Sequence, residues 1–308
     1  MLSQSSTEIL IRNFENRDMP LLGELYQSVI ANENAIFWWV GDEDNWGNVY
    51  CAFEDGKMIA KGQVSIINVV PPGRSTENNH SIYINLKTIP ERENDIDLLD
   101  NVYQYLYIRA NQLKETLPQE YGTILCVGND SAEIANNQFF IQKGYLHLNS
   151  LYGMNRDLNE PIPELKLQEE FQFSFWKMET SDEEKDYLDI DAEIWPDTPI
   201  GLNRLSENKN NKLWTSMVIR QKDAIVGGLM AWQGADHGVI EDVFVREPWR
   251  KRGIAKYLLT QALKYLKANQ LQSASLMVLT TNKSALALYE SVGFCADKEE
   301  VRYFTELN

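Results

Sequence analysis

The sequence has few of the residues that bind metal ions or form disulfides. Its 308 residues include only three histidines and three cysteines. The cysteines form no CxxC pair and lie far apart, at Cys51, Cys126 and Cys295. The histidines show no ligand spacing either. We therefore expect no disulfide framework and no metal site, as is typical of a protein in a reducing compartment.

Long apolar runs are also missing. No stretch approaches the roughly 20 residues that span a bilayer. The opening MLSQSSTEIL has no basic segment followed by an apolar core. These features predict a protein without a leader or a membrane segment, and we expect a cytoplasmic location.

The sequence also has fewer basic than acidic residues. The chain has 29 basic and 45 acidic residues, a net charge of −16. Cut after Glu160, the first part carries a net charge of −11 and the second −5. Both parts would repel polyanions, which argues against nucleic-acid binding and against attachment to anionic membranes. An acidic surface is compatible with a cationic substrate such as an amine, and equally with ordinary solubility.

The length predicts two domains. A stretch with two prolines and four acids, DLNEPIPELK at 157–166, interrupts any periodicity and predicts a linker. We place the domains at 1–158 and 169–308, with the linker at 159–168. Each part has enough apolar residues for its own core, since 44% of the chain is hydrophobic.

The same order of elements is predicted twice. In the second half, periodicity predicts strands and helices in the order 171–178 (strand), 181–194 (helix), 213–232 (hairpin), 237–245 (strand), 253–269 (helix), 273–280 (strand), 283–292 (helix) and 301–307 (strand). The first half repeats this order and ends with a helix at 96–113, a strand at 123–128, a helix at 132–142 and a strand at 145–158. The pattern predicts a mixed α/β (α+β) fold present in two copies.

The segment VIEDVFVREPWRKRGIAK, residues 239–256, concentrates the positive charge. It passes from a strand into an amphipathic helix whose first turn contains Gly253, and its part from Arg246 to Lys256 has a net charge of +4. Cations at a helix N-terminus are unfavourable, by about 0.3–1 kcal/mol each. Such an arrangement in an acidic protein favours an anion site, where backbone N–H groups, a glycine and basic side chains surround a pyrophosphate. A basic surface helix is the alternative.

This segment resembles the acetyl-CoA loop of the GNAT N-acetyltransferases. Arg250-x-x-Gly253-x-Ala255 follows the family pattern Arg/Gln-x-x-Gly-x-Gly/Ala. Downstream, NKSALALYESVGF at 282–294 is similar to the second motif of that family. The resemblance implies two tandem GNAT folds, each a mixed and mostly antiparallel sheet flanked by helices. It is clearest over 240–294 and weak over 1–155.

The resemblance also implies how acetyl-CoA, the acyl donor, would bind. The strand before the loop separates from its neighbour, so that the backbone amides around Val243, Phe244 and Val245 bind the acetyl carbonyl and the pantetheine arm. The pyrophosphate would bind the loop, and Asn282 would contact the cofactor. The loop residues are Arg250, Lys251, Arg252, Gly253, Ile254, Ala255 and Lys256.

Three residues are candidates for the chemistry. Tyr289 matches the tyrosine that protonates the departing CoA thiolate in this family. The strand VIEDVFV is also similar to that of spermidine/spermine acetyltransferases, which puts Glu241 at the general-base position and Asp242 beside the amine. A carboxyl pKa near 4.3 is far from the amine value of about 10.4, so this base needs a raised pKa or a relaying water. Strand alternation predicts that only one of the two carboxylates faces the thioester, and we expect Glu241.

The first half reads as a degenerate copy. Aligning Pro90 with Pro248 pairs Arg92 with Arg250, but puts Asp95 where Gly253 stands and Asp97 where Ala255 stands. The aligned segment 88–98 has a net charge of −3. Phe140 replaces the tyrosine of the second motif. We expect no catalysis from this half.

Two functions fit these observations. The first is an N-acetyltransferase that moves the acetyl group of acetyl-CoA to a primary amine of a small molecule or peptide, by direct attack and without a metal. The second is a non-catalytic acyl-CoA-binding sensor or scaffold, which the degenerate half would suit. Neither involves a nucleic-acid or membrane partner, and the chain could be a monomer or a homodimer.

Overall fold

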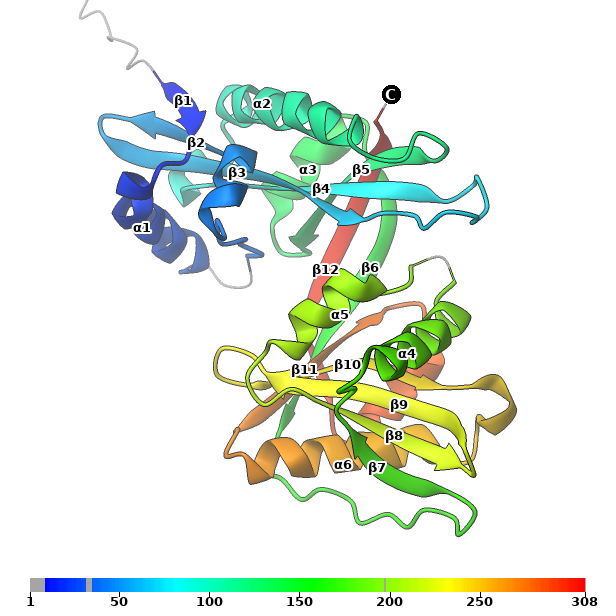
Figure 1. Cartoon of the computed structure of the whole chain (residues 1–308). Helices are drawn as coiled ribbons and strands as arrows, with labels where there is room; N and C mark the ends of the chain where they lie inside the picture. Colours follow the sequence, from blue (N-terminus) through cyan, green and yellow to red (C-terminus); the bar gives the residue numbers. More distant parts are fainter. Residues whose placement is uncertain (1–8, 32–34, 197, 308) are drawn as a thin grey trace, which may run out of the picture. The chain divides into compact units, whose positions relative to one another are not determined.

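The strand pairings follow one pattern twice along the chain, in two units (Figure 1). The computed structural model describes residues 9–31, 35–196 and 198–307. Of these, unit 1 takes the residues up to Ser150 and those from Glu300 onward, while unit 2 takes Leu151–Glu299. Each unit has a run of four antiparallel strands followed by one parallel pairing. The mixed, mostly antiparallel α/β class predicted from the sequence is therefore confirmed.

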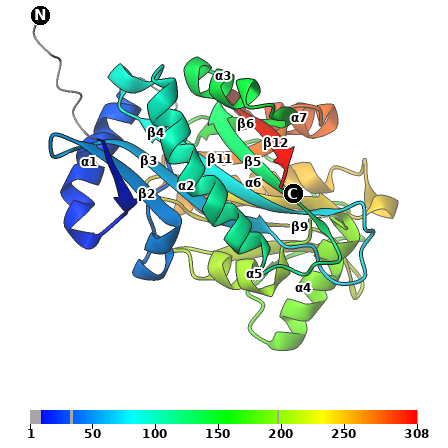
Figure 2. The same ribbon diagram turned by 90° about the horizontal axis from the view of Figure 1, so that it is seen from above.

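Unit 1 has helices on both faces of its sheet. Helix α2 lies over β2, β3 and β4 (Figure 2), and α1 packs on the opposite face in a separate apolar cluster. The strands run in the order β1-β2-β3-β4-β5-β12, with β4 and β5 parallel. Their bounds are β1 Leu10–Asn13, β2 Val49–Glu54, β3 Lys57–Asn68, β4 Asn79–Thr88, β5 Gly122–Asp130 and β12 Cys295–Glu306. The helices are α1 Met19–Ile30, α2 Ile96–Lys114 and α3 Ile134–Gln142, with short 3-10 turns η1 Asn16–Asp18, η2 Glu43–Asn48 and η3 Pro90–Arg92.

Unit 2 repeats this plan. Helix α6 covers one face of its sheet, and α4 and α5 cover the other (Figure 1). The strand order is β6-β11-β10-β9-β8-β7, with β10 and β11 parallel. The strands are β6 Leu146–Asp157, β7 Gln172–Trp176, β8 Thr215–Gln221, β9 Ala224–Gln233, β10 Gly238–Val245 and β11 Ser273–Leu279. The helices are α4 Ser181–Ile194, α5 Gly201–Lys209, α6 Ile254–Ala268 and α7 Lys283–Glu290, with the 3-10 turn η4 Glu247–Trp249. Within the residues that the structure describes, no helix is long and apolar enough to cross a membrane.

The last strand of each unit comes from the other half of the chain. Residues 300–306 of β12 pair with β5, and residues 151–157 of β6 pair with β11. The expectation that the strands at 145–158 and 301–307 complete their own halves is therefore wrong. The domain bounds given from the sequence stay a prediction: one domain at 1–158, a linker at 159–168 and a second domain at 169–308. Helix α5 was not predicted at all.

A pair of glycines allows β9 to pack closely on β10. Gly227 and Gly228 lie opposite Val245 and Phe244. A methyl group added at Gly228 would lie 2.9 Å from the Phe244 ring and 3.3 Å from the Met217 carbonyl oxygen. Phe244 is buried in the cluster under α4 and α5, so its ring has little room to move.

We expect Gly228→Ala to destabilise the protein by about 1–3 kcal/mol, because the added methyl overpacks a buried site. Gly23→Ala is the matched control. Gly23 lies inside α1 with nothing within 4 Å of an added methyl, so this change should stabilise by up to about 1 kcal/mol through helix propensity. Urea denaturation followed by tryptophan fluorescence measures both. Equal effects of the two substitutions would contradict the packing argument.

Candidate active site

Strand β10 separates from β11 soon after the two begin to pair. Over the described part of the chain, their parallel pairing involves Gly238 and Val239 and does not continue. The pairing of β10 with β9 goes on to Val245. The β11 side of residues 243–245, which were predicted to bind the acyl donor, is therefore without a strand partner. This is the separation that the resemblance implies.

The loop after β10 leads into α6, and no side chain caps the start of this helix. Gly253 is the N-cap of α6, and no side chain accepts a hydrogen bond there. Its φ of +79° favours glycine, and a Cβ at this position would point into open space. Lys251, two residues earlier, also has a left-handed φ of +62°. Alternating backbone handedness of this kind forms anion-binding nests of N–H groups.

The basic side chains around this helix start are mostly unpaired. Arg246 binds Glu193 at 2.7 Å, and Arg252 lies 3.8 Å from Glu170. For the residues that are described, no ion pair involves Arg250, Lys251 or Lys256. The Arg250 guanidinium donates a hydrogen bond to the Val245 carbonyl at 3.1 Å and is otherwise exposed. Uncompensated positive charge and open N–H groups together fit a pyrophosphate.

The two carboxylates of β10 lie on the same face of the sheet. Glu241 is opposite Met230 and Phe244 is opposite Gly228, so β10 carries one extra residue between them. Asp242 occupies this bulge with a φ of +52°. The expectation that alternation would separate Glu241 from Asp242 is therefore wrong, because a bulge breaks the two-residue period.

Helices α4 and α5 surround this carboxylate pair. The Tyr187 hydroxyl donates a hydrogen bond to Asp242 Oδ2 at 2.8 Å, and the Arg204 guanidinium lies 3.9 Å from Glu241 Oε2. Burial raises the pKa of Asp242 and of Glu241, although Arg204 opposes both shifts. A raised pKa makes a carboxylate a better base toward an amine.

A third carboxylate, Asp191 of α4, completes the cluster. Its side chain is 2% exposed and accepts a hydrogen bond from the Ile200 N–H at 2.7 Å. Burial raises its pKa to about 6, and the charge of Asp242 adds to the shift. The sequence analysis missed Asp191, Tyr187 and Arg204, since α4 and α5 carry no motif that marks them. Within the described ranges, no group of three or more His, Cys, Asp or Glu is placed to hold a metal ion.

Tyr289 and Asn282 both belong to α7. Asn282 is the N-cap, and its Oδ1 accepts a hydrogen bond from the Ala285 N–H at 3.1 Å. Tyr289 packs against Phe294 in the apolar cluster under α6, and burial raises its pKa to about 12. A phenol with such a pKa keeps its proton at neutral pH. Among the described residues, no hydrogen bond or ion pair joins Tyr289 to the carboxylate cluster.

The same place in unit 1 is filled by its own side chains. Helix α2 begins six residues after Pro90, as α6 does after Pro248. Its N-cap is Asp95, whose carboxylate accepts a hydrogen bond from the Leu98 N–H at 2.9 Å, which lowers the pKa of Asp95. Arg92 binds Asp95 at 2.7 Å and Glu54 at 2.6 Å. The Leu98 N–H and the Arg92 guanidinium, which an anion would need here, are therefore already paired within unit 1.

Side chains of unit 1 also occupy the place where β4 separates from β5. Their parallel pairing covers Asn79–Ile84. Beyond it, the buried Lys87 ammonium donates to Asn129 Oδ1 at 2.9 Å and pairs with Glu133. Lys87, Asn129 and Glu133 thus satisfy one another at this opening.

Comparison with known proteins agrees with this geometry. The Acetyltransferase (GNAT) family matches residues 168–294. A GCN5-related N-acetyltransferase from Sphaerobacter thermophilus superposes with a TM-score of 0.78 at 19% identity, covering 97% of this chain and 96% of that one. A tandem GNAT protein from the clavulanic acid biosynthesis pathway superposes with a TM-score of 0.68 at 11% identity, covering 98% and 99%.

One curated relative is similar in sequence over a short region. N-alpha-acetyltransferase MAK3 of Arabidopsis thaliana is 35% identical over 88 residues, which is 27% of this chain. The chain spans less than half of that relative's length, 46%.

Fold and family together define the class. The chain has the architecture of tandem acetyltransferases of the GNAT type over nearly its whole length. Its region 168–294 matches the GNAT family, whose enzymes use acetyl-CoA as acyl donor.

The buried Asp191 predicts a pH-dependent stability. Its pKa is raised from 3.8 in the unfolded chain to about 6 in the fold. The native state therefore binds the extra proton, and stability falls as the pH rises from about 4 to about 6. We expect Asp191→Asn, which can still accept from Ile200, to raise the free energy of unfolding at pH 7 by an order of 2–3 kcal/mol and to leave it unchanged at pH 4.

Asp189→Asn is the control, since Asp189 is an exposed residue of the same helix. It should change stability little at either pH. Denaturant unfolding at pH 4, 5, 6 and 7 measures the difference. An Asp191→Asn variant that is less stable than the parent at pH 7 would show that the native state needs the charged carboxylate.

Proposed function

We propose that unit 2 transfers the acetyl group of acetyl-CoA to a primary amine of a small molecule or peptide, by direct attack in a ternary complex. The uncapped, glycine-opened start of α6 beside the separation of β10 carries this proposal. The family match and a relative named as an N-alpha-acetyltransferase support an amine acceptor. We extend the proposal to a cytoplasmic protein that works as a monomer or homodimer.

The donor would bind along the loop and the open side of β10. Residues 250–256 would hold the pyrophosphate through N–H groups and basic side chains, because no side chain caps α6 and, among the described residues, Arg250, Lys251 and Lys256 form no ion pair. Asn282, exposed at the start of α7, would contact the same molecule. Bound acetyl-CoA supplies the activated acetyl group. The amides of Val243–Val245 would donate to its carbonyl oxygen as negative charge develops there.

The acceptor would meet the carboxylate cluster. Asp242, fixed by Tyr187, would bind the ammonium form of the amine through charge. Glu241 would take one proton from the amine nitrogen, directly or through a water, which frees the lone pair for attack. Its raised pKa supports this role. Tyr289 would hold a proton at its hydroxyl for the departing sulfur, since its pKa of about 12 lies well above neutrality.

Gly253→Asp tests the donor site. An aspartate there would place a negative charge where the phosphates would bind. We expect the acetyl-CoA dissociation constant from calorimetry to rise at least about 100-fold. The control is Gly56→Asp, which has the same change of charge and a similar φ of +77° with open space around it. Unchanged affinity in Gly253→Asp would exclude this site.

Tyr289→Phe and Glu241→Gln test the chemistry. We expect each to lower kcat by about 10²–10⁴-fold while acetyl-CoA binding stays intact, because each removes a proton-transfer group. Activity of the parent should rise with pH as Glu241 loses its proton, and this acidic limb should be absent in Glu241→Gln. Free thiol release with a panel of amines measures turnover.

Tyr257→Phe is the control for Tyr289, since Tyr257 also packs against the apolar cluster under α6. It should retain full turnover. A parent protein that binds acetyl-CoA tightly but releases no thiol with any amine would instead be a sensor or scaffold.

A further inference from the structure

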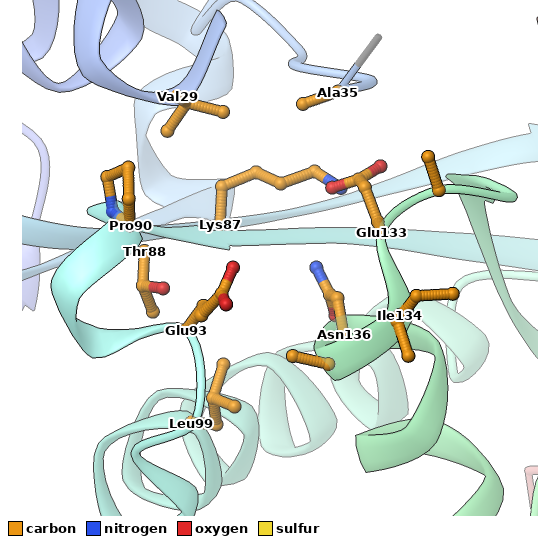
Figure 3. A pocket seen from close by; sticks show the side chains of 12 residues that line it. Val29, Ala35, Lys87, Thr88, Pro90, Glu93, Leu99, Glu133, Ile134 and Asn136 are labelled. Atoms are coloured by element: carbon orange, nitrogen blue, oxygen red, sulfur yellow. The ribbon is translucent and has the colours of Figure 1, made fainter. Parts of the chain in front are cut away.

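Unit 1 contains a pocket of about 280 Å³ at the place that corresponds to the donor site of unit 2 (Figure 3). It lies where the end of β4, the turn η3 and the start of α3 meet. This is just below the roughly 300–1,000 Å³ of typical ligand pockets, which suits a small ligand better than a whole CoA molecule.

Its walls are partly polar and partly apolar. The apolar part of the lining consists of Val29, Ala35, Pro90, Leu99, Ala132, Ile134 and Ala135. The basic group at the edge, Lys87, is already neutralised by Glu133 and bound to Asn129. The pocket therefore offers no unpaired positive charge to an anionic ligand.

One buried acceptor in the pocket, Asn136 Oδ1, lacks a donor among the described residues. The Asn136 side chain donates to the Leu86 carbonyl at 2.7 Å, which fixes its orientation, and its Oδ1 is buried with no hydrogen-bond partner in the described part of the chain. Glu93 points its carboxylate into the space between Lys87 and Asn136 (Figure 3). Glu93 is exposed and accepts a hydrogen bond of 3.3 Å from the Asn94 side chain. A buried acceptor without a donor is unfavourable, so this site favours a ligand that supplies N–H groups.

We propose that this pocket binds a small aliphatic primary ammonium compound, with its charged head between Glu93 and Asn136 and its stem against the apolar walls. The site is distinct from the acetyl-transfer site of unit 2 and does not depend on it. Unit 1 would then be a binding module for an amine, in which the donor groove of a GNAT fold has been converted into a small acidic pocket. An amide of the same size would bind more weakly, and a carboxylate would be repelled.

The test uses three probes of matched length: n-pentylammonium, pentanamide and pentanoate. Each is titrated into the full chain, and the backbone N–H resonances of Thr88 and residues 132–136 report binding at the pocket. We expect pentylammonium to bind about tenfold more tightly than pentanamide, and pentanoate and acetyl-CoA to leave these resonances in place. A change confined to unit 2 resonances, a stronger effect of pentanoate, or the absence of any shift at these residues would overturn the proposal.

Glu93→Gln should weaken pentylammonium binding about tenfold and leave pentanamide binding unchanged, since it removes only the charge. The exposed Glu91 of the same turn does not line the pocket, and Glu91→Gln is the matched control. Equal losses in the two variants would show general electrostatic attraction and would contradict a specific site. Asn136→Leu, which fills the pocket and removes its orphan acceptor, should abolish binding of both neutral and charged probes.

Discussion

The binding properties of unit 2 depend on backbone groups that its own fold leaves unpaired at two adjoining places. The parallel pairing of β10 stops after Val239, and α6 begins at Gly253 without a capping side chain. Unpaired N–H groups are unfavourable unless water or a ligand satisfies them. In the proposed function, these two adjoining places and the unpaired cations beside them hold an anionic donor with an extended arm.

Unit 1 has the same backbone plan and resolves the same constraint internally. Asp95 takes the place of the anion at the start of α2, while Lys87 and Asn129 bridge the separated strands. The Asp95 cap and the Lys87–Asn129 bridge both come from side chains, while the order of the strands is the same as in unit 2. The loss of the donor site in this unit therefore follows from charge and capping, and the fold itself remains. What is left open is the small pocket with acceptors in place of donors.

Much of this could be predicted from the sequence, because β10, α6 and α7 have strong periodicity and glycine marks the start of α6. The degenerate loop of unit 1 could also be predicted, since Asp95 is a strong N-cap residue. Three features could not be predicted from the sequence. The bulge at Asp242 has no glycine to signal it, and aspartate tolerates a left-handed φ. The exchange of β6 and β12 could not be predicted, because the periodicity of a strand does not show which neighbour it pairs with. Asp191, Tyr187 and Arg204 meet the site only through the packing of α4 and α5.

The net charge of −16 argues against polyanions as partners, yet the loop after β10 suits a pyrophosphate. The two statements agree once distance is considered. Exposed charges farther apart than about 8 Å are largely screened at physiological ionic strength, so the acidic surface as a whole contributes little at the exposed loop. From Glu241 to Val245 the strand extends by roughly 13 Å, and the loop of net charge +4 lies beyond it. A phosphate at the loop thus experiences mainly local positive charge, while an ammonium at Asp242 experiences mainly carboxylates. One strand can therefore present opposite potentials to an anionic donor and a cationic acceptor, each drawn to its own end, whereas a long polyanion would meet the acidic surface around both.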